Sequence, residues 1–382
     1  MKRGVAGLNE RLTGVPGSRA RLETPALLLD VDRFEANVAG LAAMARANGM
    51  GLRPHAKSHK CAAMARRQMA AGALGIACAK SGELLGLFEA GLTSLMLTAP
   101  ISSPLKIARL AEAAARGLDL IVVADRSDLV AAFGQAAVGA GTEIGVLVDI
   151  DTGLGRTGVT TLEAAVVLAR QIAAQPGLRF DGVQAYNGKV QHIFDHEERR
   201  VANRASNSRL VPILHALAAA GLPASIVSGG GTGSHMLDFK DRVLTEVQPG
   251  SYVFMDEGYR PVDLHGDGTR VFDFAMLVAV SVIGHSATGE AIIDAGSKSF
   301  AVDGPQPRAF REGNEIGSIV WAGDEFGRVK THDGIAPLPA GTRLECTVPH
   351  CDPTVNLHDF IHVVRGDRLE AIWDVEARGL SD

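Results

Sequence analysis

The stretch RPHAKSHK, residues 53–60, places a lysine where covalent chemistry can occur. Lys57 follows a short apolar run that is typical of a strand. A lysine at the carboxyl end of a buried strand loses solvation, which lowers its pKa and makes its amine a Schiff-base nucleophile. Four further basic residues would lower this pKa more, but they equally fit an anion site: Arg53, His55, His59 and Lys60. A solvated surface lysine is the third alternative.

Two glycine-rich segments could hold an anion. SGGGTGS, residues 228–234, follows a predicted strand, and its backbone N–H groups and the hydroxyls of Thr232 and Ser234 suit a phosphate. The segment lacks the lysine and the spacing of a nucleoside-triphosphate loop, and it is not a dinucleotide fingerprint. QPGSY, residues 248–252, could supply a second set of donors. The alternative for both segments is a plain glycine-rich turn.

The segment PHCDPTVNLHD, residues 349–359, contains candidate metal ligands. On an extended chain, residues two apart share a face, so His350 and Asp352 could bind one ion while Cys351 points away. Imidazole plus carboxylate suits Zn²⁺, Mn²⁺ or other borderline divalent ions, and two protein ligands leave positions open for water and substrate. The Cys351 thiolate is a competing ligand, and a polar turn without metal is the alternative.

The segment QAYNGKVQH, residues 184–192, supplies a candidate general base, His192. Tyr186 in the same segment, and Arg156 in DTGLGRTG, are candidates for positioning polar groups. A structural role is the alternative for each of the three, because an isolated histidine or tyrosine usually has one.

Apolar strand-like runs alternate with Ala- and Leu-rich helical stretches from about residue 50 to residue 255. The predicted strands are 51–54, 75–80, 94–99, 119–124, 144–150, 180–186, 224–228 and 243–248. Eight strands with helical crossovers predict an α/β fold, specifically a closed (β/α)8 TIM-type barrel. A doubly wound open sheet stays open as the alternative.

After about residue 260 the helical periodicity fades, and strands separated by Gly, Pro and Asp turns are expected. We therefore divide the chain into a barrel, residues 30–258, and a β-rich domain formed by residues 1–29 plus 259–382. An early strand, 24–31, is expected at the junction. Functional residues of such barrels follow the carboxyl ends of the strands. Five unusual segments do so and should share one face: HAKSHK, DTGLGRTG, NGKVQH, GGGTGS and PGSY.

The composition of the 382 residues excludes several classes of protein. A net charge of −5 gives no basic footprint for nucleic acid. The four cysteines form no CxxC pair, and nothing indicates an oxidising compartment. The N-terminus has no apolar signal region, and no apolar stretch is long enough to span a bilayer. A soluble cytoplasmic protein is expected.

Six ordered motifs resemble one family: RPHAKSHK, DTGLGRTGV, QAYNGKVQH, SGGGTGS, EVQPGSYVFMD and PHCDPTVNLHD. They are similar to those of the metal-activated D-threonine aldolase and D-serine dehydratase family, fold-type III pyridoxal phosphate enzymes related to alanine racemase. The resemblance runs from about residue 24 to the C-terminus. It implies a pyridoxal phosphate barrel joined to a β-rich domain, and a homodimer with active sites near its interface.

The resemblance also implies roles for individual residues. Lys57 would be the Schiff-base lysine, Arg156 would contact the phenolic oxygen of the cofactor, and Tyr186 would line its ring. The metal, Mn²⁺, Mg²⁺ or Zn²⁺, would be held by His350 and Asp352. The phosphate would be held by Thr232, Gly233, Gly250, Ser251 and Tyr252.

The ligand pair favours one branch of the family. Dehydratase members resemble His-x-Cys and aldolase members His-x-Asp, and here Asp352 stands two residues after His350. We therefore expect cleavage of a D-β-hydroxy-α-amino acid of the D-threonine type to glycine and an aldehyde, with His192 as the base. Three alternatives stay open: an aldolase that cleaves 3-hydroxyaspartate to glycine and glyoxylate, a dehydratase acting on D-serine or 3-hydroxyaspartate, and a pyridoxal phosphate carrier without turnover.

Overall fold

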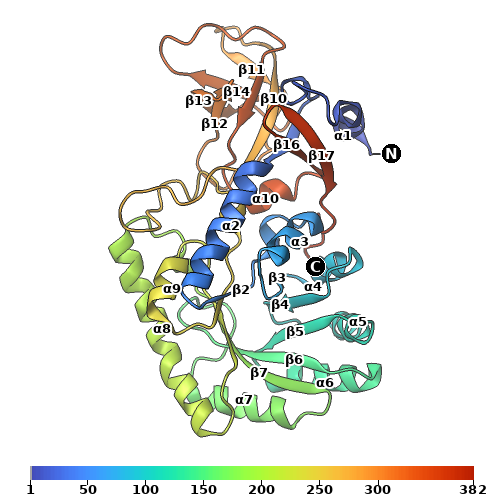
Figure 1. Cartoon of the computed structure of the whole chain (residues 1–382), viewed down its shortest axis with the longest axis vertical. Coiled ribbons are helices and arrows are strands. Elements are labelled where there is room, and N and C mark those ends of the chain that lie inside the picture. Colours follow the sequence, from blue (N-terminus) through green and yellow to red (C-terminus); the bar gives the residue numbers. More distant parts are fainter. Residues whose placement is uncertain (1) are drawn as a thin grey trace.

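The computed structural model describes residues 2–382, and its strands form two sheets (Figure 1). The first is an eight-stranded parallel sheet in the order β2-β9-β8-β7-β6-β5-β4-β3. Its two edge strands meet, because a parallel bridge pairs His55, just after β2, with Ala77 of β3. This closure confirms the predicted TIM-type barrel and excludes the doubly wound open sheet.

Helices alternate with the barrel strands along the chain. The strands are β2 (Gly51–Leu52), β3 (Ile76–Cys78), β4 (Ser94–Leu97), β5 (Asp119–Ala124), β6 (Ile144–Asp149), β7 (Leu178–Ala185), β8 (Ile226–Gly229) and β9 (Glu246–Val247). The helices are α2 (Val31–Ala47), α3 (Ala62–Ala70), α4 (Ser81–Glu89), α5 (Pro104–Ala115), α6 (Ser127–Ala140), α7 (Leu162–Ala174), α8 (His196–Ala219) and α9 (His235–Asp241).

Helix α5 shows how the sequence sets these elements. The Ser103 side chain caps the helix by accepting the Lys106 N–H, and Pro104 occupies the first turn, where no backbone donor is needed. Ile107, Leu110 and Ala114 recur at helical spacing and are buried, whereas Arg109 and Glu112 on the outward face are exposed. The burial of this apolar stripe fixes the orientation of the helix on the barrel.

The second sheet has nine strands in the order β11-β14-β13-β12-β15-β10-β1-β16-β17. Its strands are β1 (Ala26–Asp30), β10 (Met276–His285), β11 (Ala291–Ile293), β12 (Arg308–Arg311), β13 (Asn314–Trp321), β14 (Gly327–Thr331), β15 (Arg343–Cys346), β16 (Phe360–Arg365) and β17 (Arg368–Asp374). The predicted β-rich C-terminal region is thus confirmed. Two short helices, α1 (Gly4–Asn9) and α10 (Cys351–Val355), come from the same two chain segments as the strands of this sheet.

The N-terminal strand β1 lies inside this second sheet, antiparallel to β10 and parallel to β16. Helix α2 begins at the next residue, Val31, and runs toward the barrel (Figure 1). We keep the division into residues 30–258 and residues 1–29 plus 259–382 as a proposal.

Some predicted boundaries differ from the structure. Helix α3 begins at Ala62 and not directly after RPHAKSHK, because Lys60 adopts a positive φ of 52° that no α-helix contains. Strands β2 and β9 have two residues each, shorter than the predicted runs 51–54 and 243–248. The residues of each run beyond its strand belong to loops that carry site residues. Their apolar character comes from burial in the protein and does not indicate pairing with another strand.

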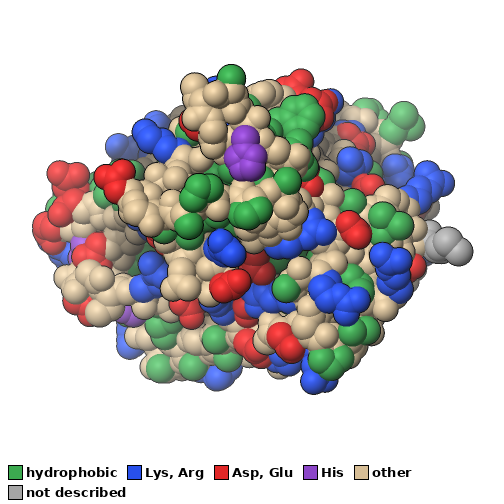
Figure 2. Space-filling view, turned by 90° about the horizontal axis from the view of Figure 1, so that it is seen from above, with side chains coloured by type: hydrophobic (Ala, Val, Ile, Leu, Met, Phe, Trp, Pro, Cys, Tyr) green, Lys and Arg blue, Asp and Glu red, His purple; other side chains and the backbone are tan. Residues whose placement is uncertain are grey.

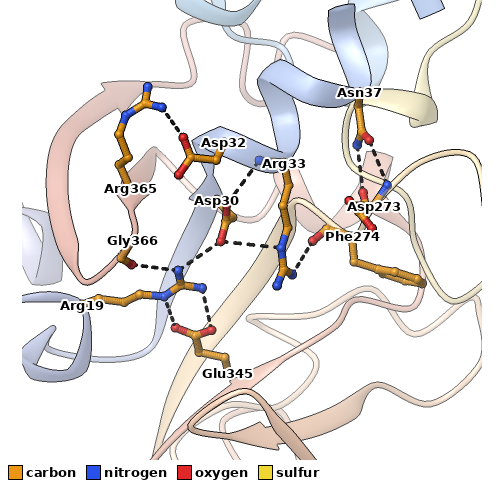
Figure 3. Close-up of polar contacts among 10 residues, drawn as sticks. All are labelled: Arg19, Asp30, Asp32, Arg33, Asn37, Asp273, Phe274, Glu345, Arg365 and Gly366. Atoms are coloured by element: carbon orange, nitrogen blue, oxygen red, sulfur yellow. Dashed lines mark hydrogen bonds and ion pairs between the residues drawn. The ribbon is translucent and has the colours of Figure 1, made fainter. Parts of the chain in front are cut away.

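A polar network joins the N-terminal segment, helix α2 and the second sheet (Figure 3). The Asp30 carboxylate caps α2 by accepting the Arg33 N–H at 3.3 Å, and it accepts Nη1 of Arg19 at 3.0 Å. Arg19 also donates to Glu345 of β15 at 2.7 Å and to the Gly366 carbonyl at 3.1 Å. One nearly buried carboxylate therefore anchors the passage from the sheet into the barrel.

The face over the β-rich end carries Lys and Arg side chains interspersed with Asp and Glu, without a broad patch of one sign (Figure 2). Within residues 2–382, no helix is both long enough and apolar enough to cross a membrane.

The Asp30 network predicts a stability difference between two neighbouring aspartates. Asp30→Asn removes the charge at a side chain that is 10 % exposed and should lower the free energy of unfolding by about 1–3 kcal/mol. Asp32 pairs with Arg365 in the open, its side chain being 56 % exposed, so Asp32→Asn should cost less than about 1 kcal/mol. Denaturant unfolding of the two variants measures this, and equal losses would contradict the anchoring role of Asp30.

Candidate active site

A cavity of about 310 Å³ lies where the barrel strands end. Its wall contains residues from the loops after most barrel strands: His55, Lys57, Lys80, Thr98, Arg156, Gln184, Tyr186, Gln191, Gly231, Thr232, Gln248, Gly250, Ser251 and Tyr259. Among the described residues of this wall, the charged side chains are the basic Lys57, Lys80 and Arg156, and none is a carboxylate. The wall therefore suits an anionic ligand.

The floor of the cavity is a polar network inside the barrel. Gln248 donates to Oε1 of Gln184 at 3.2 Å and to Oγ of Ser228 at 2.8 Å. Ser228 in turn donates to Glu246 at 2.7 Å, and Glu246 forms a buried ion pair with Arg53 at 2.7 Å. Arg53 is therefore neutralised within the barrel and is not part of an anion site.

The other basic residues of RPHAKSHK are also distinguished by their surroundings. His55 accepts the Lys57 N–H on Nδ1 and contacts the Thr98 hydroxyl through Nε2, and burial lowers its pKa to about 3. His59 contacts Gln68, and burial lowers its pKa to about 4. Both imidazoles are therefore neutral at pH 7 and act as packed supports for the turn that carries Lys57.

Lys57 lies in the 3-10 turn η3 (Ala56–Ser58), and its Nζ forms a short ion pair with Oδ2 of Asp352. Burial opposes the charge of Lys57, but the Asp352 carboxylate outweighs it and raises the pKa of Lys57 above its ordinary value. The expectation that the pKa of Lys57 is lowered was therefore wrong for the protein without a bound ligand. The sequence could not show that a carboxylate 295 residues away would meet this amine.

The two glycine-rich segments meet at one side of the cavity. Thr232, Gly250 and Ser251 line the wall, and the Thr232 hydroxyl accepts the Tyr252 N–H at 3.1 Å, which joins the two loops. Gly233 and Tyr252 stand behind the wall. The Gly233 N–H donates to Gln191 at 2.9 Å, and the buried Tyr252 hydroxyl accepts from Gln68 at 3.1 Å.

The cradle formed by these loops depends on glycine at one position. A Cβ on Gly231 would lie 2.6 Å from Oε1 of Gln191, so a larger residue would displace the glutamine that holds the Gly233 N–H. Behind the loop, His235 donates from Nδ1 to the Thr232 carbonyl at 2.7 Å. The loop is thus held in shape by contacts on its far side, and Thr232 faces the cavity.

The cavity wall also contains two of the remaining predicted residues, Arg156 and Tyr186, and a tyrosine that the sequence analysis missed, Tyr259. The Arg156 guanidinium lies 5.7 Å from the ring centroid of Tyr186, and both residues line the cavity. The exposed His192 ring packs against Tyr259 with centroids 4.3 Å apart, and desolvation of this packed face lowers the His192 pKa. Tyr259 forms the cavity wall and connects His192 to it. Tyr259 is one of only three tyrosines in the chain, and this rarity was the one feature of the sequence that could have singled it out as a candidate site residue.

The segment with His350 and Asp352 is not extended as expected. His350 is the N-cap of α10, which begins at Cys351, so Asp352 lies in the first helical turn. The helix packs beside η3, at the boundary between the second sheet and the barrel (Figure 1). This packing brings Asp352 to Lys57. Cys351 is buried, and burial raises the pKa of its thiol, so it is a poor competing ligand.

A buried carboxylate couples this helix to the Tyr259 loop. Asp256 accepts the Cys351 N–H on Oδ2 and the Tyr259 N–H on Oδ1, each at 2.9 Å. Asp256 therefore fixes the relative positions of Tyr259, which supports His192, and of α10, which carries Asp352. The sequence analysis assigned no role to Asp256.

The residues present fit pyridoxal phosphate. The wall of the cavity contains a lysine amine, a guanidinium beside an aromatic ring, and a pair of glycine-containing loops with a hydroxyl group. A metal ion has weaker support, because residues 2–382 contain no group of three or more His, Cys, Asp or Glu side chains that could hold one. His350 and Asp352 remain a two-donor set of imidazole and carboxylate, which suits an ion that keeps open positions.

Comparison with protein families gives two matches. The model described as "Alanine racemase, N-terminal domain" matches residues 29–258, which is more than half of the chain. The model described as "Putative serine dehydratase domain" matches residues 275–364. The two matches fall on the barrel and on the second sheet, respectively.

Characterised proteins are similar over nearly the whole chain. A 3-hydroxy-D-aspartate aldolase from Paracoccus denitrificans (strain Pd 1222) is 36% identical over 374 residues, covering 96% of this chain and 95% of the relative. A D-threonine aldolase from Arthrobacter sp. is 38% identical over 362 residues, covering 95% and 94%. The crystal structure of D-threonine aldolase from Filomicrobium marinum matches with a TM-score of 0.90 at 37% identity, covering 95% of this chain and 98% of that chain.

The neutral, buried histidines predict a loss of stability in acid. Burial holds the pKa of His59, His235 and His362 at about 4, whereas the unfolded chain titrates near 6.5. Between pH 6.5 and pH 4 the unfolded state therefore binds more protons than the folded state. As the pH is lowered through this range, the free energy of unfolding falls by up to about 1.4 kcal/mol per pH unit for each histidine. Denaturant unfolding at several pH values measures the slope. His59→Gln should make it shallower, and an unchanged slope would contradict the assignment.

Proposed function

The chain belongs to the alanine racemase-like family of pyridoxal phosphate enzymes that includes D-threonine aldolase and 3-hydroxy-D-aspartate aldolase, and we propose that it cleaves D-β-hydroxy-α-amino acids to glycine and an aldehyde. The observation that carries the proposal is the meeting of Lys57 with Asp352 at the cationic cavity. It unites the amine needed for the cofactor with the carboxylate of a His-x-Asp pair.

We assign the cofactor contacts from this geometry and the resemblance together. Lys57 would hold pyridoxal phosphate covalently, and Thr232, Gly250 and Ser251 would receive the phosphate, with Gly233 and Tyr252 supporting them from behind. Arg156 would contact the phenolic oxygen, and Tyr186 would flank the ring. When bound, the cofactor supplies an electron sink for the bond that breaks at Cα.

His192 is the proposed general base. The ring packs against Tyr259 of the cavity wall, with centroids 4.3 Å apart, and this contact holds the imidazole beside the cavity. A ring nitrogen of His192 would take the proton of the substrate β-hydroxyl. The O–H electrons then form the carbonyl of the aldehyde as the Cα–Cβ bond breaks, and a proton added at Cα completes glycine. The lowered pKa of His192 keeps this base unprotonated at neutral pH.

We propose that His350 and Asp352 hold a divalent metal such as Mn²⁺, Mg²⁺ or Zn²⁺ beside the cofactor. A metal there would act as a Lewis acid and template for the β-hydroxyl. Lys57 and Asp352 pair with each other in the protein alone, so covalent use of the Lys57 amine would release the carboxylate for the ion. A homodimer and a cytoplasmic location remain proposals that rest on the resemblance and the composition.

A dehydratase is the second candidate, favoured by the match of residues 275–364 to the serine dehydratase model. It would expel the β-hydroxyl as water and give a 2-oxo acid and ammonia. The burial of Cys351 and the position of Asp352 at Lys57 favour the aldolase. The similarity to named aldolases also favours an enzyme over a pyridoxal phosphate carrier.

Product identification tests the proposal directly. Purified protein with pyridoxal phosphate and Mn²⁺ is offered D-threonine, D-serine and the stereoisomers of 3-hydroxyaspartate. Glycine with acetaldehyde or glyoxylate supports the aldolase and identifies its substrate side chain. A 2-oxo acid with ammonia as the main product would overturn it in favour of the dehydratase, and absence of turnover with every substrate would favour the carrier.

The first mutational prediction separates the two lysines of RPHAKSHK. Lys57→Ala should remove the visible absorbance of protein-bound pyridoxal phosphate and abolish turnover, because the amine that binds it is gone. Lys60→Arg keeps a positive charge outside the cavity wall and should retain both. Absorbance spectra and turnover are compared for the two variants. A Lys57→Ala protein with the full absorbance and activity would refute the assignment.

The second prediction concerns the base. His192→Ala should reduce turnover by about 10²–10⁴-fold while the cofactor absorbance persists. The acidic limb of the wild-type kcat/KM profile should lie below the ordinary histidine pKa of about 6.5, because desolvation lowers the His192 pKa. His215→Ala, on the exposed face of α8, is the control and should match wild type. Equal turnover in the His192 and His215 variants would exclude His192 as the base.

A further inference from the structure

Asp303 makes a contact that no part of the proposed mechanism uses. Its Oδ2 lies 2.8 Å from Nδ1 of His350, which is 47 residues away in the sequence. A carboxylate only accepts hydrogen bonds, so Nδ1 of His350 is the donor. This is the one hydrogen bond that the His350 ring forms within residues 2–382. It selects the tautomer whose proton is on Nδ1 and leaves Nε2 with its lone pair.

The segment that carries Asp303 is fastened to the backbone around His350. A Cβ on Gly304 would lie 2.7 Å from the Pro349 carbonyl oxygen, so the two chains touch at this glycine. The Thr354 hydroxyl donates to the His350 carbonyl at 2.7 Å and accepts the Ala301 N–H at 3.1 Å. The contact between Asp303 and His350 is therefore one of several contacts that hold residues 301–304 against residues 349–354.

The histidine held in this way is the proposed metal ligand. An imidazole that binds a metal through one ring nitrogen usually donates its other N–H to a carboxylate or carbonyl, which fixes the ring and strengthens the ligand. Here the carboxylate is in place at Nδ1, and the opposite nitrogen is the one left for a ligand bond. An ordinary surface ion pair is the competing explanation, since the Asp303 side chain is 54 % exposed and such pairs contribute little.

We propose that Asp303 is a positioning residue that fixes the tautomer and ring orientation of His350 for divalent metal binding. This inference rests on the metal-dependent form of the proposed function. The proposed role of Asp303 affects the affinity of the protein for the metal ion. A loss of this affinity can therefore be measured separately from the reaction steps assigned to Lys57 and His192. The carboxylate acts through His350 and contacts neither the substrate nor the cofactor.

The test measures Mn²⁺ affinity of the pyridoxal phosphate-loaded protein by calorimetry or by the electron paramagnetic resonance signal of free Mn²⁺. Asp303→Ala should raise the Mn²⁺ Kd by about 10–100-fold. Asp303→Asn, which retains a neutral acceptor, should give a smaller increase. Asp333→Ala removes an exposed aspartate in the turn between β14 and β15 and should leave Kd unchanged. Cofactor absorbance and the thermal midpoint should match wild type in all three variants, and saturating Mn²⁺ should restore turnover.

Several outcomes would overturn the proposal. These are a wild-type Kd in Asp303→Ala, an equal loss in Asp333→Ala, or a loss accompanied by a lowered thermal midpoint and cofactor absorbance. Aldolase turnover by a wild-type protein without saturable Mn²⁺ binding would overturn the metal site and this inference but leave the cleavage reaction. A selective Kd increase in a protein that cleaves no D-β-hydroxy-α-amino acid would support the inference and refute the proposed function.

Discussion

The ion pair between Lys57 and Asp352 is the interaction on which the organisation of the site depends, because it joins the two sheets of the molecule at their reactive residues. Lys57 comes from the turn after the first barrel strand, and Asp352 comes from a short helix of the β-rich region. Neither sheet alone contains both groups. The distance between the two sheets at this point therefore decides whether the Lys57 amine and the Asp352 carboxylate can face one ligand.

Three buried or nearly buried carboxylates maintain that alignment. Asp30 fixes the passage from β1 into α2, Asp256 ties the loop of Tyr259 to the start of α10, and Glu246 neutralises Arg53 beneath the cavity. Each is paired with specific donors, so its desolvation is compensated only in the native arrangement. Of the basic groups in the cavity wall, Lys57 is paired with Asp352, and Lys80 and Arg156 supply the positive charge that suits an anionic ligand.

The sequence predicted the barrel because the alternation of apolar strands and amphipathic helices is a local pattern, and it predicted Lys57, Thr232, Gly250 and Ser251 because each follows a strand at the active face. It did not predict contacts between distant segments. Lys57 and Asp352, or His350 and Asp303, are neighbours only after folding. The helical turn at Cys351 was missed because its N-terminus is held by Asp256, far away in the sequence.

The position of β1 has a consequence for the order in which the protein is assembled during synthesis. The strand leaves the ribosome before its two partners, because β10 and β16 follow some 250 and 330 residues later in the chain. The barrel sequence lies between them and can fold from local contacts while β1 waits unpaired. The nine-stranded sheet, and with it Asp352, is completed last. A chain that ends before β10 therefore contains the barrel sequence and Lys57, but neither the partners of β1 nor Asp352.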